Sequence, residues 1–168
     1  EEMVVFNKPN SAISNVLNSF HQEQLHYEAE LCFIYEQGKF TAVGFGLDLT
    51  KRQLQSKLKQ KGLPWERAKA FDGSALFSDF VSIDNINEDL TLELKINEDI
   101  IQEGGISLMM YKPQDMLNQL QSFMTLEDGD IVMTGTPKGV GTITQGDIFT
   151  GCVRIGDEII VESRWLAQ

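Results

Sequence analysis

The sequence predicts an α+β domain that is mainly β, with a few short helices. Apolar runs of strand length recur along the chain, and several are separated by turn residues. Only two segments carry apolar residues at helical spacing. The 168 residues, 42% of them hydrophobic, contain no repeat, low-complexity tract or linker. We therefore expect one domain over residues 1–168 with a core of its own.

The strand-like runs pair into three predicted hairpins. In the first, residues 31–35 and 40–45 flank a connection in which Gly38 marks a tight turn. The other two predicted hairpins pair residues 90–96 with 100–103 and residues 147–155 with 158–163.

Two segments are predicted to be helices. Residues 114–124 follow Pro113, which favours a first helical turn, and their apolar stripe is expected to face the core: Met116, Leu117, Leu120, Phe123 and Met124. Residues 51–61 are a weaker case, with Leu54 and Leu58 four apart and Thr50 as the expected N-cap.

The net charge of −11 limits the classes of partner. An acidic surface repels phosphate backbones and anionic lipids, so no nucleic acid or membrane partner is expected. The longest apolar run is far shorter than the roughly 20 residues that cross a bilayer, and no secretory signal is visible. Cys32 and Cys152 form no disulfide framework, which favours the cytoplasm. An anionic substrate would need a local group of Lys or Arg side chains.

Glu28 and Glu30 enter the first hairpin pointing the same way. Side chains alternate along a strand, so both carboxylates share one face with His26. On this segment alone, a polar strand face in contact with water is the commoner arrangement. Asp48 favours a cluster of carboxylates instead. It follows the second strand, and a hairpin brings the start of its first strand near the end of its second.

Three clustered carboxylates repel one another unless a cation lies between them. Their oxygens suit Mg²⁺, with Mn²⁺ and Ca²⁺ as alternatives. The residues themselves leave either His26 or Asp48 as the third ligand. A second polar pair, His21 and Glu23, is expected to have a structural rather than a chemical role.

Four motifs in register resemble the fumarylacetoacetate hydrolase family. They are HYEAEL at residues 26–31, GLDLTKRQLQ at 46–55, RAKAFD at 67–72, and MTLEDGD at 124–130 leading into TGTP at 134–137. FNKP at residues 6–9 is similar to a segment near the family's N-terminus. The similarity covers nearly the whole chain. It implies a mixed β-roll or sandwich like the family's C-terminal domain, usually in a homodimer.

The resemblance also implies roles for particular residues. It assigns a divalent metal to Glu28, Glu30 and Asp48, which selects Asp48 over His26 and leaves His26 as a packed strand residue. It further implies that four residues contact the substrate, with Lys69 catalytic as well: Arg52, Gln55, Lys69 and Thr136.

These implied roles fit a small anionic oxo-acid. Three carboxylates and one divalent cation sum to about −1, so Arg52 and Lys69 would make the pocket locally positive. A 2-oxo-acid or 1,3-dicarbonyl chelates a metal through two oxygens, and the metal stabilises the enolate that forms when a C–C or C–H bond breaks. We expect Lys69, its pKa lowered by burial and nearby charge, to donate to that oxyanion or to move a proton.

The sequence departs from the family pattern near its start. Hydrolytic members carry a histidine and a nearby glutamate on a lid segment upstream of the Phe-x-Lys-Pro match. Only residues 1–5 precede Phe6 here, so we expect this lid segment to be missing or truncated. Leu47 also replaces the asparagine that many members have before the metal aspartate, and residues 73–77 differ from the common pattern.

Three classes of function therefore compete. The first is metal-dependent C–C bond hydrolysis of an acylpyruvate or fumarylacetoacetate type of substrate. The alternative within the family is oxaloacetate decarboxylation or tautomerisation, or isomerisation of 2-hydroxyhepta-2,4-diene-1,7-dioate, which need less water activation. A further alternative is a non-catalytic relic that binds metal or oxo-acid.

Overall fold

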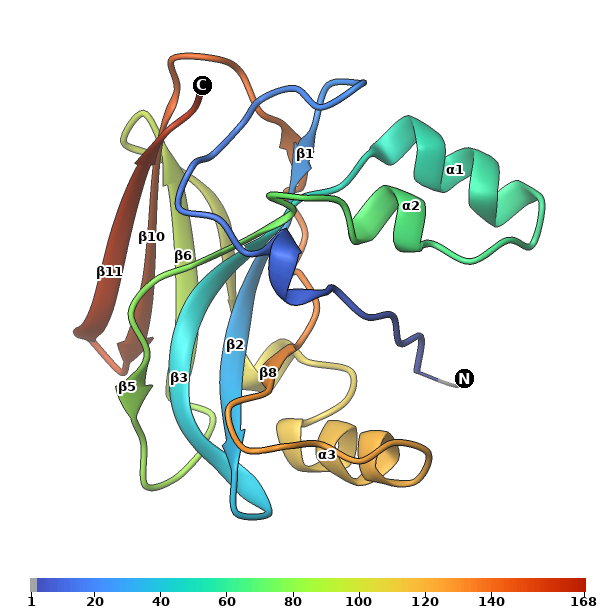
Figure 1. The fold of residues 1–168 in the computed structure, drawn as a ribbon. Coiled ribbons are helices and arrows are strands. Elements are labelled where there is room, and N and C mark those ends of the chain that lie inside the picture. The colour runs from blue at the N-terminus through green and yellow to red at the C-terminus, as the bar shows by residue number, and fades with distance from the viewer. Residues whose placement is uncertain (1–2) are drawn as a thin grey trace.

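The computed structural model describes residues 3–168 and confirms a mainly β architecture. Two curled sheets pack against each other, and three helices lie on the far side of one sheet (Figure 1). The helices are α1 (Arg52–Gln60), α2 (Glu66–Lys69) and α3 (Pro113–Gln121). The N-terminal segment, with the short helix η1 (Asn10–Ala12), runs along this helix side as well.

The central sheet has the strand order β4-β3-β2-β8, and the short β5 also pairs with β3. Its strands are β2 (Ala29–Glu36), β3 (Lys39–Asp48), β4 (Ala75–Phe77), β5 (Val81–Ser82) and β8 (Ile131–Met133). The outer sheet has the order β11-β10-β6-β7, with β6 (Leu90–Ile96), β7 (Asp99–Gly105), β10 (Ile148–Ile155) and β11 (Glu158–Leu166). β1 (His26–Tyr27) pairs with β9 (Gly141–Thr142), and η2 (Ile106–Leu108) follows β7.

The hydrophobic core lies between the two sheets. Alternation along β2 buries Leu31 and Phe33, and Phe45 of β3 packs against Trp165 of β11 with ring centroids 6.0 Å apart. Tyr27 meets Phe149 of β10 edge to face at 5.3 Å. Each large apolar side chain buried in this way contributes on the order of 2 kcal/mol. The other face of β2 and β3 is therefore free to carry polar groups toward the helices.

All three predicted hairpins are present. They are β2–β3, β6–β7 and β10–β11, each extending one to three residues beyond its prediction at one or more ends. β10 begins at Ile148, one residue later than predicted. The turn of the second hairpin is shorter than predicted, because β7 begins at Asp99. Asn97 and Glu98 alone make that turn, both with positive φ, as tight hairpins favour.

The helices differ from their predictions at the ends. α3 ends at Gln121 rather than at residue 124, so Phe123 lies beyond it and is 62% exposed, while Met116, Leu117 and Leu120 are buried as predicted. Thr50 does not cap α1, because its hydroxyl accepts a hydrogen bond from Lys69. The carboxylate of Glu23 instead accepts the backbone N–H groups of Gln53 and Leu54 at 2.8 and 3.3 Å.

Within residues 3–168, none of the helices is both long and apolar enough to span a bilayer.

Candidate active site

The register of the first hairpin brings three acidic residues together. Ala29 lies opposite Leu47 and Glu30 opposite Gly46, so Glu28, just before β2, faces Asp48 at the end of β3. The N–H of Asp48 donates to the carbonyl of Glu28 at 2.8 Å. The exposed fractions of Glu28, Glu30 and Asp48 are only 8%, 4% and 2%, and one carboxylate oxygen of each lies within 4.8 Å of the others. Three hard oxygen donors this close fit a divalent cation.

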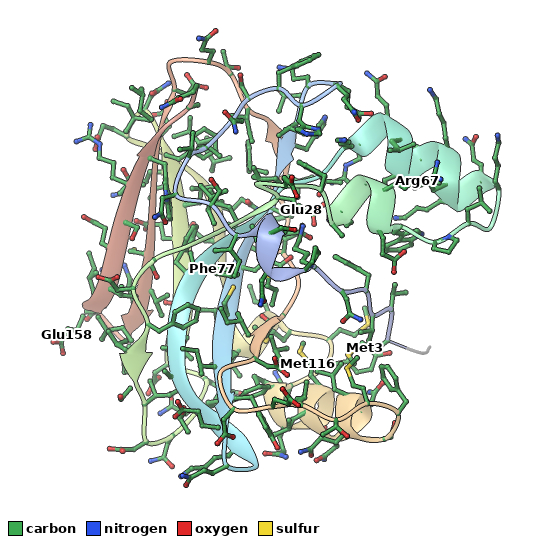
Figure 2. All side chains as sticks on the ribbon, viewed as in Figure 1. Met3, Glu28, Arg67, Phe77, Met116 and Glu158 are labelled. Atoms are coloured by element: carbon green, nitrogen blue, oxygen red, sulfur yellow. The ribbon has the colours of Figure 1, made fainter. Side chains whose placement is uncertain are left out.

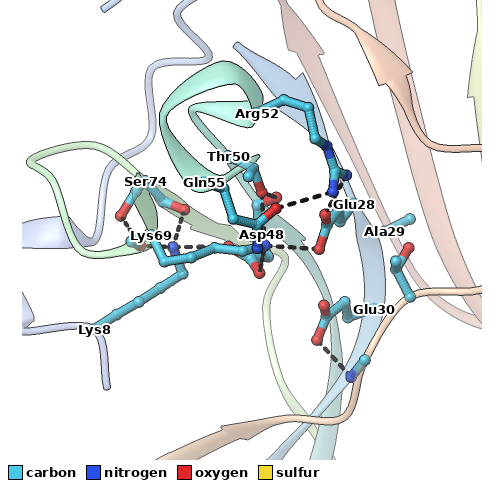
Figure 3. Close-up of polar contacts among 12 residues, drawn as sticks. Lys8, Glu28, Ala29, Glu30, Asp48, Thr50, Arg52, Gln55, Lys69 and Ser74 are labelled. Atoms are coloured by element: carbon cyan, nitrogen blue, oxygen red, sulfur yellow. Dashed lines mark hydrogen bonds and ion pairs between the residues drawn. The ribbon is translucent and has the colours of Figure 1, made fainter. Parts of the chain in front are cut away.

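Lys69, at the end of α2, lies between two of the carboxylates (Figure 3). Its Nζ is 2.8 Å from Glu28 Oε2 and 2.6 Å from Asp48 Oδ2, and it donates to Thr50 Oγ1 at 2.7 Å. Burial alone would lower the pKa of Lys69, but the charges and hydrogen bonds of Asp48 and Glu28 outweigh it, and the pKa is raised. The expected lowering of this pKa is therefore wrong for the metal-free protein, because the nearby charge is negative.

Lys8 is a second cation of the site, with a largely buried side chain, and the sequence predicted no role for it. Its Nζ lies 2.8 Å from Asp48 Oδ1 and donates to the backbone carbonyls of Lys69 and Ser74. Its pKa is lowered, mainly by burial and against the attraction of Asp48. The acceptors lie 61 and 66 residues away along the chain, so only its place in the FNKP motif pointed to it.

Arg52 completes the positive side of the site from the first turn of α1. Its guanidinium lies 2.6 Å from Glu28 Oε1 and donates to Gln55 Oε1 at 3.0 Å. The site therefore has three cationic side chains beside its three carboxylates: Lys8, Arg52 and Lys69. The sequence predicted only Arg52 and Lys69.

Glu30 has a different environment from the other two carboxylates. The N–H of Gly135 donates to its Oε2 at 2.7 Å, and no Lys or Arg among residues 3–168 forms an ion pair with it. Burial, followed by the charge of Asp48, raises the pKa of Glu30 to about 8. A cation bound beside Glu30 would relieve this cost.

A cavity of about 580 Å³ opens over these groups and is lined by every predicted site residue: Glu28, Glu30, Asp48, Arg52, Gln55, Lys69 and Thr136. Its other walls are the N-terminal segment from Met3, the apolar face of α3 and the loop between β8 and β9. Figure 2 shows Met3 and Met116 below Glu28, and both line the cavity, whereas Arg67 does not line it. Charged side chains therefore line one end of the cavity, and apolar side chains line the other.

The remaining polar candidates lie outside the cavity. His26 pairs with Thr142 in the β1–β9 ladder and does not line the cavity. His21 stacks on Phe71 at 5.0 Å, and its neighbour Glu23 caps α1. The positions of His26, His21 and Glu23 agree with the structural roles expected for these residues.

Comparison with known proteins shows what this architecture is similar to. The family model described as fumarylacetoacetate hydrolase C-terminal matches residues 1–167. The mitochondrial oxaloacetate tautomerase of Bos taurus is 37% identical over 165 residues, covering 87% of this chain and 74% of the relative. An oxaloacetate tautomerase of Escherichia coli K12 is 35% identical over 168 residues, covering 89% and 77%.

A solved structure adds a ligand-bound neighbour. Fumarylpyruvate hydrolase from Pseudomonas aeruginosa, in complex with Mn²⁺ and pyruvate, superposes with a TM-score of 0.84 at 26% identity, covering 96% of this chain and 77% of its own. The family model spans almost the whole sequence and the relatives exceed one third identity over most of it, so the chain belongs to the fumarylacetoacetate hydrolase family of enzymes.

Proposed function

We propose that residues 3–168 hold one divalent cation through Glu28, Glu30 and Asp48, with Mg²⁺ as the first candidate and Mn²⁺ or Ca²⁺ as alternatives. The observation that carries this proposal is the buried cluster of three carboxylates, in which Glu30 lacks a cationic partner among the described residues. The family's Mn²⁺-bound neighbour supports it. When bound, such an ion would polarise a 2-oxo group and stabilise the charge that enolisation places on its oxygen.

We propose that the reaction is the interconversion of the enol and keto forms of oxaloacetate. The relatives named above are oxaloacetate tautomerases, which favours this alternative over hydrolysis, the first of the functions that the sequence predicts. In the enol-to-keto direction the enol O–H releases its proton to water, and C3 gains a proton from an acid of the protein that water then reprotonates. No water is consumed and no carbon–carbon bond breaks.

The chain's own residues would supply binding and proton transfer. Arg52, Gln55 and Thr136 line the cavity where the substrate carboxylates would lie. Lys69 is the buried acid nearest to the carboxylate cluster, so its ammonium is the proposed proton donor to C3 and its amine the acceptor in the reverse direction. A cation that neutralises Glu28 and Asp48 would weaken their hold on the Lys69 proton and make it easier to transfer.

C–C bond hydrolysis of an acylpyruvate is the second candidate. It is favoured by the likeness to fumarylpyruvate hydrolase, which was solved with pyruvate bound. Hydrolysis would use the same cavity and the same cation but needs an activated water as well.

Parallel assays separate these functions. The full chain with Mg²⁺ or Mn²⁺ is expected to accelerate loss of the oxaloacetate enol absorbance more than cleavage of acetylpyruvate. Lys69→Met is expected to lower kcat by at least about 100-fold, since general acid–base catalysis contributes that much. Asp48→Asn is expected to weaken Mn²⁺ binding, measured by calorimetry, by about tenfold or more. Acceleration of neither reaction by the metal-loaded wild type would overturn the proposal.

We also propose that the whole chain is one catalytic domain and forms a homodimer in the cytoplasm. Leu108, Met110 and Phe123 are 75%, 80% and 62% exposed, and a second copy of the chain would cover such apolar side chains. Both cysteines are free thiols, as suits a reducing compartment. Light scattering on the purified chain is expected to give twice the monomer mass of 18.9 kDa. A mass of one chain at micromolar concentration would refute the dimer.

A further inference from the structure

A glutamine on β7 connects the carboxylate strand to the loop that carries Thr136. Gln102 is 1% exposed. Its Oε1 accepts the N–H of Ala29, the residue between Glu28 and Glu30, at 3.0 Å. Its Nε2 donates to Thr136 Oγ1 and to the carbonyl of Pro137, both at 2.9 Å. One buried amide thus spans from the strand to the loop.

The hydrogen bonds fix the orientation of this amide and of the Thr136 hydroxyl. The N–H of Ala29 can only donate and the carbonyl of Pro137 can only accept, so the oxygen and nitrogen of Gln102 cannot be exchanged. Thr136 Oγ1 must therefore accept from Nε2. The carbonyl of Pro137 lies 3.4 Å from Thr136 Oγ1, beyond the usual O–H···O range of about 2.5–3.0 Å. Because this hydrogen bond is long and the carbonyl of Pro137 already accepts from Gln102, the hydroxyl hydrogen can turn to a stronger acceptor in the cavity that Thr136 lines.

Close packing keeps the loop on β7. A Cβ at Gly104 would lie 2.9 Å from Cγ of Pro137, and a Cβ at Gly139 would collide with the backbone carbonyl oxygen of Ile101, so both positions lack room for a side chain. Gly139 also has a φ of +106°, which favours glycine. The loop therefore lies directly against the strand, where the amide of Gln102 can reach it.

We propose that Gln102 is a positioning residue that makes the Thr136 hydroxyl a donor to an anionic oxygen of the bound oxo-acid. The inference deepens the proposed function and rests on it for the place of the substrate. The N–H of Gly135 in the same loop supports Glu30 by a separate bond. Loss of the Gln102 bond is therefore expected to weaken oxo-acid binding more than metal binding.

The test uses Gln102→Glu in the full chain loaded with Mn²⁺. The new carboxylate still accepts the N–H of Ala29 but cannot donate to Thr136 or Pro137. We expect the Kd of oxalate, measured by calorimetry, and the KM of oxaloacetate to rise about tenfold, as for the loss of one hydrogen bond to a charged group. The Kd of Mn²⁺ is expected to stay within about twofold. Gln114→Glu, on the exposed side of α3, is the matched control for the added charge.

A double-variant cycle identifies the route of the effect. Thr136→Val is expected to weaken oxalate binding to a similar degree, and adding Gln102→Glu to it is expected to cost little more, because Gln102 acts through Thr136. Simple repulsion by the new carboxylate would instead add to the effect of Thr136→Val, and that result would overturn the inference. An unchanged oxalate Kd in Gln102→Glu would overturn it as well.

Two further outcomes are decided by the same measurements. If Gln102→Glu does not fold, Gln102→Asn, whose amide is one methylene too short to span the gap, is expected to show the same rise in oxalate Kd. A wild type that binds oxalate but does not tautomerise oxaloacetate would overturn the proposed reaction, and the Kd values would still decide the role of Gln102. A wild type that binds no oxalate would overturn the role of Gln102.

Discussion

Among single residues, the three carboxylates of the cavity differ in how the protein neutralises them. Asp48 meets Lys8 and Lys69, and Glu28 meets Lys69 and Arg52. Glu30 accepts the N–H of Gly135 instead. Glu30 is therefore the one of these three carboxylates whose charge no Lys or Arg among residues 3–168 neutralises by an ion pair.

The stability of the metal-free protein is expected to fall as the pH rises from about 5 to 8. The pKa of Glu30 is about 8 in the folded chain, above its ordinary value of 4.5. Between these values the folded state keeps a proton that the unfolded state has lost, so stability declines across this window. Chemical denaturation of EDTA-treated protein should show a smaller decline in Glu30→Gln. The exposed Glu103→Gln is the control, and equal slopes in wild type and Glu30→Gln would contradict this account.

Among the elements, α1 depends on a residue from a distant turn for its start. The N-cap residue of α1 makes no side-chain hydrogen bond to the helix. The two carboxylate oxygens of Glu23 instead accept the backbone N–H groups of Gln53 and Leu54. Because Arg52 and Gln55 stand in the first turns of α1, the same carboxylate fixes two residues of the cavity wall.

Glu23→Ala is expected to lower the free energy of unfolding by about 1 kcal/mol, the usual cost of a lost helix cap. The variant should also raise the KM for the oxo-acid, because Arg52 and Gln55 become less well placed. Thermal or chemical denaturation and steady-state kinetics give the two values. Glu88→Ala, an exposed acidic residue outside α1, is the control. A stability loss with no change in KM would show that the cap acts on the fold alone.

For the whole molecule, the sequence pattern predicted correctly the parts of the fold that depend on residues close together along the chain. The hairpins follow from alternation and turn residues, and the hairpin of residues 29–48 was enough to place Glu28 near Asp48. The resemblance was needed to add Lys69 and Thr136, which arrive from other parts of the chain. Lys8 and Gln102 were missed because their partners are about 35 to 75 residues away along the chain. Thr50 was wrongly predicted as an N-cap, because its hydroxyl accepts a hydrogen bond from Lys69.

The alternation of β2 and β3 has a consequence for changing this enzyme. Residues such as Leu31, Phe33 and Phe45 belong wholly to the space between the sheets, while Glu28, Glu30 and Asp48 belong wholly to the opposite face. A designer can therefore repack one face for thermal tolerance and reshape the other for a different oxo-acid, with little interference between the two efforts. Side chains alternate between the two faces of a strand. The residues that determine stability and those that determine substrate selectivity are therefore separate, although they share the same strands.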